Sequence, residues 1–332
     1  MRVANAFDLR RCFKGEHLRA LDWMAYSGSF DSAALDHIAD ALSARSGSKG
    51  LKYYLASLYL QLGEADKVDA LLNTTGMASS EMKWFAMLML YCRCRELPLP
   101  RLKRSDDQCL DYLQERYLSF KNPAAFQSEQ SSVKQFTCLL QSKKYFAVIG
   151  NAPVSTTDTD SRFQLTDDCL SVCFNNYHLN PRIEGQAFVH VVTPSWRSGG
   201  QWRSGGQVRG KHLIITGNSI FHRRSKVWRR FSDQPRYTGI HTVPREIWSS
   251  LVEKLGASPS AGLLLLSYLE RHLDINEKEG LVAGFSDDVP VQNHSYDSDP
   301  VSLAHNWIAE AAMRGKILQS IGSKTRSLRV VR

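Results

Sequence analysis

The segment NHSYDSDPVSLAHNWIAE, residues 293–310, places two histidines eleven residues apart. Histidine exchanges a proton near neutral pH, so a positioned pair is suited to general acid–base catalysis. His294 lies close to Tyr296, and His305 lies five residues before Glu310. The pattern predicts an acid–base site, although two histidines with no catalytic role around the start of a helix would give the same sequence pattern.

A helix is predicted to carry the second histidine. Asp299-Pro300 is a typical helix start, and an apolar stripe follows as far as Ala311. His305 would then lie in the early turns, where the positive end of the helix macrodipole favours a neutral imidazole. A neutral histidine is what a general base requires. His294 precedes this helix in a loop, where it is placed to face an anionic leaving group.

Short apolar runs in the second half of the chain predict the strands of a parallel sheet. They are YFAVIG at 145–150, LSVCF at 170–174, FVHVV at 188–192, HLIITG at 212–217 and LVAGF at 281–285. Continuous apolar strands that alternate with helices indicate a sheet covered on both faces. Residues 141–332 are therefore predicted to form a Rossmann-like α/β domain.

Polar residues follow the first two predicted strands, at the place where an open α/β sheet binds its ligand. Gly150 would allow a close backbone approach, and Asn151 and Asn175 would offer donors and acceptors. The sequence lacks both the GxGxxG pattern and the GxxxxGK[ST] loop, which disfavours a dinucleotide site and a P-loop. Glycine and asparagine turns of this kind are also common in loops that bind nothing.

A further candidate is the start of the helix predicted within GASPSAGLLLLSYL, residues 256–269. Ser258 is a typical N-cap, and Pro259 is a typical first helical residue. The backbone N–H groups that follow, together with the positive helix end, would form a site for phosphate or carboxylate. They belong to Ser260, Ala261 and Gly262. A well-capped core helix is the alternative, and both interpretations can hold together.

The first 120 residues are predicted to be helical. The segment LKYYLASLYLQLGEADKVDALLNT, residues 51–74, spaces its small and apolar residues as a tetratricopeptide helix pair does. A fainter copy precedes it at close to the period of such repeats, about 34 residues. Residues 1–120 are thus predicted to form a tetratricopeptide-like domain, with an unrelated helical bundle as the alternative. The polar residues 121–140 are predicted to be a linker.

The net charge of +9 predicts an anionic partner. Much of this charge lies at 222–230 and 323–332. No nucleic-acid-binding signature accompanies it, so an anionic acceptor or peripheral contact with the inner membrane is favoured over nucleic acid. No apolar run is long enough to cross a bilayer. Seven cysteines without paired spacing predict reduced thiols in a cytoplasmic protein.

Four segments resemble, in order, the motifs of the eukaryotic-type sialyltransferases and their bacterial relatives, which use CMP-activated sugars. FAVIGN…SVCFNN resembles the large motif, SPSAG…LVAGF the small motif, HSYD the third motif and HNWIAE the H-x4-E motif. They span residues 145–310, about half of the chain. The resemblance implies a GT-A-variant glycosyltransferase domain at 141–332.

The resemblance also implies roles for individual residues. One group would hold the donor through its CMP, carboxylate or phosphate: Gly150, Asn151, Asn175, Ser260, Ala261, Gly262, His294 and Tyr296. In catalysis His305 would deprotonate the acceptor hydroxyl, His294 would stabilise the departing phosphate, and Glu310 would support the helix. CMP leaves with one phosphate to neutralise, so neither a metal nor another cofactor is implied.

The chain departs from the animal enzymes of that group. Ala261 stands where the small motif usually has threonine, which removes one hydroxyl contact. No cysteine stands at 145–146 to begin the disulfide between the large and small motifs, and no N-terminal membrane anchor is expected. These departures favour a bacterial enzyme that builds a surface glycan such as lipopolysaccharide or capsule. Its donor sugar would be sialic acid or Kdo.

Two other interpretations stay open. The tripeptide DTD at 158–160 is similar to the metal-binding DxD of nucleotide-diphosphate glycosyltransferases, although it follows a polar run rather than a strand. Alternatively, the chain is a helical-repeat scaffold with a degenerate transferase domain, which would not need to bind CMP.

Overall fold

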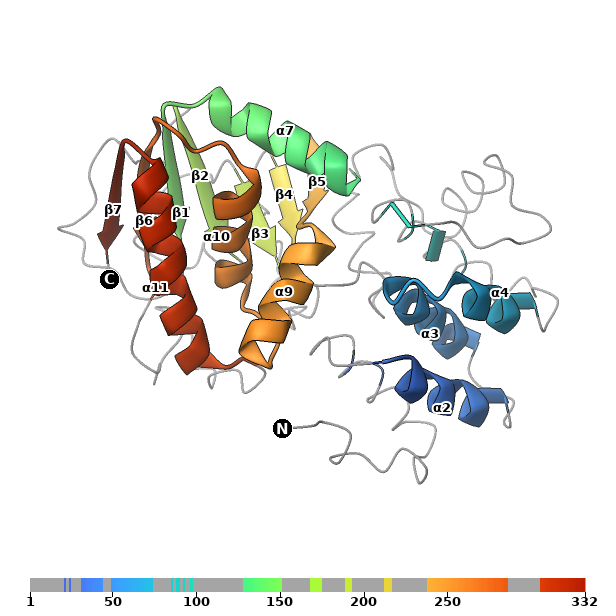
Figure 1. Ribbon diagram of the computed structural model, residues 1–332. Coiled ribbons are helices and arrows are strands. Elements are labelled where there is room, and N and C mark those ends of the chain that lie inside the picture. The colour runs from blue at the N-terminus through green and yellow to red at the C-terminus, as the bar shows by residue number, and fades with distance from the viewer. Residues whose placement is uncertain are drawn as a thin grey trace, which may run out of the picture. The chain divides into compact units, whose positions relative to one another are not determined.

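The computed structural model describes eight segments of the chain, which form two compact units. The segments are residues 31–43, 49–73, 128–150, 168–174, 189–192, 212–216, 238–285 and 305–331, with single positions at 21, 24, 85, 88, 89, 92, 96 and 97. Figure 1 shows the helices of the first unit in blue and the sheet of the second in green to red.

The N-terminal unit contains helices α2 (Ser32–Ser43), α3 (Lys49–Gln61) and α4 (Ala65–Asn73). A polar network joins all three: Asp36 of α2 accepts hydrogen bonds from the Tyr59 hydroxyl of α3 at 2.7 Å and from Lys67 of α4 at 2.8 Å. The helices predicted for this region are confirmed at Ser32–Ser43, Lys49–Gln61 and Ala65–Asn73. Their grouping as tetratricopeptide-like repeats stays a prediction.

The second unit is built on a seven-stranded sheet in the order β5-β4-β3-β2-β1-β6-β7, and every pair in it is parallel. Its elements are α7 (Glu129–Gln141), β1 (Tyr145–Ile149), β2 (Cys169–Phe174), β3 (Val189–Val192), β4 (His212–Ile215), β5 (Gly239–Thr242), α9 (Arg245–Leu255), α10 (Ala261–His272), β6 (Glu279–Ala283), α11 (Trp307–Lys324) and β7 (Ser327–Val331). The predicted parallel α/β domain is confirmed.

The core of this unit lies between the sheet and helices α7, α9, α10 and α11, which Figure 1 shows over one face of the strands. The inner strands β2 and β3 are buried on both faces, as is usual in parallel sheets, and are apolar except for Ser171 and His190. α10 contributes an unbroken buried run from Leu263 to Leu269. Its Tyr268 ring stacks on Phe136 of α7 with centroids 5.8 Å apart.

Part of the predicted linker at 121–140 is instead a helix. Ser128 caps α7 by accepting a hydrogen bond from the Ser131 N–H at 3.2 Å. Phe136 and Leu140 of this helix are fully buried in the core of the α/β unit. The segment was predicted to be a linker because most of its residues are polar, and only a few of them pack into the core.

A buried histidine in β5 makes the stability of this unit depend on pH. His241 is 0% exposed, and its Nε2 lies 3.1 Å from Nδ1 of His212 in β4. Burial lowers the pKa of His241 to about 3, with a smaller contribution from the charge of His212. In the folded protein His241 is thus neutral down to low pH.

Replacement of His241 with glutamine is expected to make the unit less sensitive to acid. Between about pH 6.5 and pH 3 the unfolded chain binds a proton that the folded His241 excludes, so stability falls as the pH is lowered. The loss reaches at most about 1.4 kcal/mol per pH unit. Denaturant unfolding at neutral and mildly acidic pH measures it, with exposed His37 replaced by glutamine as the control. An equal loss in His241→Gln and the parent would contradict the assignment.

Candidate functional site

Two helix starts form the candidate site, and the first is the start of α10. The end of α10 leads into the start of β6, so α10 begins at the opposite edge of the sheet, where the parallel strands have their carboxyl ends. Its N-cap is Ser260, whose hydroxyl accepts a hydrogen bond from the Leu263 N–H at 3.3 Å. The predicted cap at Ser258 was two residues too early. Ser258 is instead fixed by a tertiary contact, because its carbonyl accepts a hydrogen bond from His305.

The second helix terminus is that of α11, which begins at Trp307. Asn306 is its N-cap: its side-chain oxygen accepts from the Ala309 N–H at 3.3 Å, and its amide donates to the Leu255 carbonyl at 3.1 Å. The prediction that His305 lies inside the early turns is therefore wrong, because His305 is the residue just before the cap. It still lies beside the positive end of the helix.

His305 has a defined protonation at one ring nitrogen. Its Nδ1 lies 2.8 Å from the carbonyl oxygen of Ser258, and a carbonyl can only accept a hydrogen bond, so Nδ1 carries the proton. In the neutral ring the lone pair is then on Nε2. The ring also packs edge-on against Trp307, with centroids 5.0 Å apart. A histidine held in this tautomer is suited to accept a proton at Nε2.

Glu310 connects the two helix termini. Its Oε1 accepts a hydrogen bond from the Ser260 N–H at 2.8 Å and lies 3.7 Å from Nδ1 of His305. The side chain is 1% exposed, and no hydrogen-bond partner of its Oε2 is found among the described residues. Burial raises the pKa of Glu310, against the opposing effects of the Ser260 hydrogen bonds and the charges of His305 and Arg314.

α10 and α11 run parallel, so their positive ends lie together. Ser260 contacts Glu310 at one end of the pair, and Glu270 accepts a hydrogen bond from Ser320 at the other. Because the Glu310 carboxylate already takes the Ser260 N–H, this amide is not available to a ligand. The N–H groups of Ala261 and Gly262 form no hydrogen bond to another described residue, as is usual in the first turn of a helix. Their predicted role in anion binding stays a prediction.

The ends of β1, β2 and β6 meet the start of α10 around one aromatic ring, that of Phe285. A Cβ added at Gly262 would approach this ring to 2.5 Å, and Phe174 at the end of β2 packs edge-on against it at 6.0 Å. Gly150, after β1, donates its N–H to Ala283 and is pressed against the Gly284 backbone. The close approach predicted at Gly150 is thus made by the neighbouring strand, and its role toward a donor stays a prediction.

The described residues bring six of the predicted site residues to one edge of the sheet. These are Gly150, Ser260, Ala261, Gly262, His305 and Glu310. The other four predicted site residues, Asn151, Asn175, His294 and Tyr296, lie outside the described residues, as does the alternative DTD at 158–160.

Sequence reasoning missed three residues that shape this edge and gave Ser258 the wrong role. The missed residues are Phe285, Asn306 and Arg314, which contribute an aromatic ring, a helix cap and a buried guanidinium. Asn306 carried a recognisable signal, since asparagine is a preferred N-cap and a helical stripe follows it. Phe285 and Arg314 carried none that points to a site.

The described segments contain neither a cluster of metal-ligand side chains nor a membrane-spanning helix. Within them, no group of three or more histidine, cysteine, aspartate or glutamate side chains is arranged to hold a metal ion. Among the described helices, none combines the length and the apolar character needed to span a bilayer.

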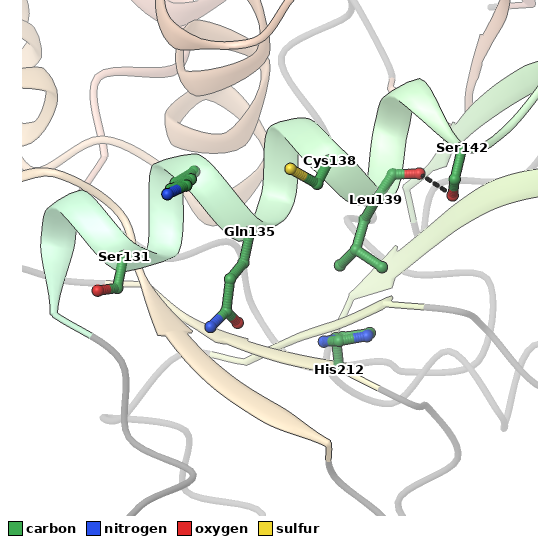
Figure 2. A pocket seen from close by; sticks show the side chains of 7 residues that line it. Ser131, Gln135, Cys138, Leu139, Ser142 and His212 are labelled. Carbon is green, nitrogen blue, oxygen red and sulfur yellow. Dashed lines mark hydrogen bonds between the residues drawn. The ribbon is translucent and has the colours of Figure 1, made fainter.

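A separate groove of about 620 Å³ runs along the outer face of α7. Figure 2 shows His212 of β4 facing Gln135 and Leu139 of this helix, with Cys138 and Ser142 further along. The groove contains none of the predicted site residues. Its His212 is engaged on both ring nitrogens, with His241 and with the Thr238 hydroxyl at 3.1 Å each.

Comparison with known proteins gives a weak likeness to a solved structure. No protein-family model matches the chain, and no curated protein does. One solved structure that it resembles is that of the sialyltransferase CstII from Campylobacter jejuni in complex with the substrate analogue CMP-3FNeuAc. The likeness covers 57% of this chain and 80% of that chain, with 10% sequence identity and a TM-score of 0.35. At that level it carries no conclusion about function.

Proposed function

We propose that the α/β unit is an inverting glycosyltransferase that moves a 2-keto-3-deoxy acidic sugar from its CMP donor to a glycan hydroxyl. The supporting observation is the arrangement of His305, Ser258 and Glu310: a histidine with its proton fixed on Nδ1 lies beside two parallel helix N-termini at the carboxyl edge of the sheet. This edge is where open α/β sheets bind ligands. The order of the four sialyl-like segments gives the donor class.

The proposed reaction is a single displacement. The acceptor hydroxyl transfers its proton to Nε2 of His305 while its oxygen forms a bond to the anomeric carbon. The bond from that carbon to the phosphate oxygen breaks, and CMP leaves with the electron pair. The N–H groups of Ala261 and Gly262, at the positive end of α10, would hold the donor's carboxylate. His294 and Tyr296 would neutralise the departing phosphate.

Sialic acid and Kdo are both donor sugars in this proposal, because each carries a carboxylate on its anomeric carbon. The acceptor class, a bacterial surface glycan such as lipopolysaccharide or capsule, is taken from the family resemblance. Incubation with CMP-Neu5Ac and with CMP-Kdo, with CMP release as the readout, separates the donors. The release should persist in the presence of a metal chelator. Chelator-sensitive release would favour the DxD alternative instead.

Alanine replacements of Asn151 and His294 are expected to weaken CMP binding by roughly ten- to a hundredfold each, the usual value of a hydrogen bond to a charged group. Both residues are assigned to the nucleotide and not to the acceptor. Calorimetric titration with CMP measures the change, and Asn276→Ala, on an exposed turn far along the chain, serves as the control.

Unchanged CMP affinity in both variants would mean that the donor site lies elsewhere. If the parent protein itself binds no CMP, the transferase proposal fails and the scaffold alternative is favoured.

A further inference from the structure

The buried stripe of α11 begins with two charged residues. Its buried members follow one another at intervals of about one turn: Glu310, Arg314, Ile317 and Ile321. The two isoleucines lie in the hydrophobic core, as expected for the inner face of a helix on a sheet. Buried charges cost stability, and apolar side chains of similar volume usually stabilise a protein more. The charged half of the stripe is the half beside the candidate site.

Arg314 is held at this edge by the aromatic cluster described above. It is 7% exposed, and its guanidinium carbon lies 5.9 Å from the centre of the Phe285 ring. Phe285 in turn packs against Phe174 and Gly262, so the guanidinium is fixed relative to the ends of β2 and β6 and to the start of α10. An arginine stacked on an aromatic ring keeps its charge when buried.

The charge of Arg314 acts on Glu310, four residues earlier on the same buried face. Burial raises the pKa of the Glu310 carboxyl, and the Ser260 hydrogen bonds, His305 and, least of these, Arg314 oppose that effect. Among the described elements, α10 and β7 make the most contacts with α11. The acidic side chain of α10, Glu270, contacts Ser320 and Lys324 at the other end of α11. The basic residue of β7, Arg329, belongs to the strand that follows that same end.

We propose that Arg314 is a positioning residue for His305 that acts through Glu310. Its charge compensates that of the buried Glu310 carboxylate four residues away on the same helix face. This carboxylate holds the Ser260 N–H at 2.8 Å and lies 3.7 Å from the His305 ring. Arg314 thereby fixes the relative position of the base and of the anion-binding end of α10. The catalytic part of this inference rests on the proposed function, whereas the charge coupling does not.

The coupling is tested by unfolding, which needs no substrate. Arg314→Met should lower the melting temperature by roughly 5–10 °C at neutral pH, because an uncompensated charge is left in the core. The loss should be smaller at acidic pH, because protonation of Glu310 removes the negative charge that Arg314 compensates. It should also be small in a Glu310→Gln background, where no charge is left to compensate.

Equal losses at both pH values and in both backgrounds would overturn the proposal and leave Arg314 a packing residue. If Arg314→Met alone does not fold, the double variant Glu310→Gln, Arg314→Met decides. A folded double variant supports the coupling, and an unfolded one contradicts it.

The catalytic part is tested by steady-state kinetics with the CMP-sugar that the parent protein uses. Arg314→Met should lower kcat by roughly ten- to a hundredfold, the cost of a misplaced catalytic group, with CMP affinity unchanged. Arg314→Lys should restore most of kcat, and Arg314→Met should cost little more in the Glu310→Gln background. A fall in CMP affinity with kcat preserved would contradict the positioning role. If the parent turns over neither donor, the proposed function fails, while the unfolding experiment still decides the coupling.

Discussion

Replacement of His305 with alanine is expected to lower turnover at least a hundredfold while leaving CMP affinity and the fold nearly unchanged. A positioned general base contributes about 10²–10⁴-fold to the rate, which alanine cannot supply. The side chain is 14% exposed and precedes the first turn of α11, so its removal opens no cavity in the main core. Among the described residues, the replacement removes the hydrogen bond from the ring to the Ser258 carbonyl. Turnover measured as CMP release, together with calorimetric CMP titration, separates the two effects.

A matched control is available at the opposite end of α10. His272 is the last residue of that helix, and its Nε2 lies 2.9 Å from the Glu246 carboxylate. His272→Ala removes an imidazole from the same unit without touching the candidate site, so it should keep parental turnover. Near-parental turnover in His305→Ala would remove His305 as the base.

Replacement of Gly150 with alanine is expected to destabilise the α/β unit by about 3 kcal/mol or more, at the upper end of the range for overpacked cores. A Cβ at this position would lie 2.2 Å from the Gly284 carbonyl oxygen and 2.9 Å from its carbon. Both are backbone atoms, so no side-chain rotation relieves the clash. The ends of β1 and β6 would have to separate and would lose the hydrogen bond from Gly150 to Ala283. Denaturant unfolding gives the free-energy difference.

Gly315→Ala is the matched comparison, because it is expected to raise the free energy of unfolding rather than lower it. Gly315 lies in the interior of α11, and no described atom would lie within 4 Å of its added Cβ. Alanine there should stabilise the helix by roughly 0.5–1 kcal/mol, because glycine loses more backbone entropy on folding. If the two glycine variants changed stability by the same amount, the packing explanation for Gly150 would be wrong.

The sheet was predictable from the sequence because its inner strands are buried on both faces and therefore read as unbroken apolar runs. β5 and β7 were missed for opposite reasons. β5 has the four-residue sequence GIHT, in which glycine is depleted in strands and Ile240 and Thr242 alone form no apolar run, even though all four residues are buried. β7 is an edge strand with mostly exposed or half-buried residues, including Arg329, and so lacks an apolar run.

The candidate site was predictable as a set of residue types but not as a geometry. Serine, asparagine and aspartate are all good N-caps, so local preference alone could not choose between Ser258 and Ser260. The choice depends on the tertiary hydrogen bond from His305 to Ser258. Arginine is usually exposed at the surface. Only the positions of Ile317 and Ile321 on the same helical face indicate that Arg314 is buried.

The strand order has a consequence for how the α/β unit forms during synthesis. β2, β3, β4 and β5 each add beside the strand that precedes them in the chain, whereas the other edge of β1 is filled only by β6. The second edge of β1, which begins at Tyr145, can therefore form its backbone hydrogen bonds only after β6, which begins at Glu279, has been synthesised. Pairing between such distant segments is slow, and an unpaired apolar edge invites association with other chains. The folding yield of this protein in a cell should therefore depend on how well the open side of β1 is protected until β6 leaves the ribosome.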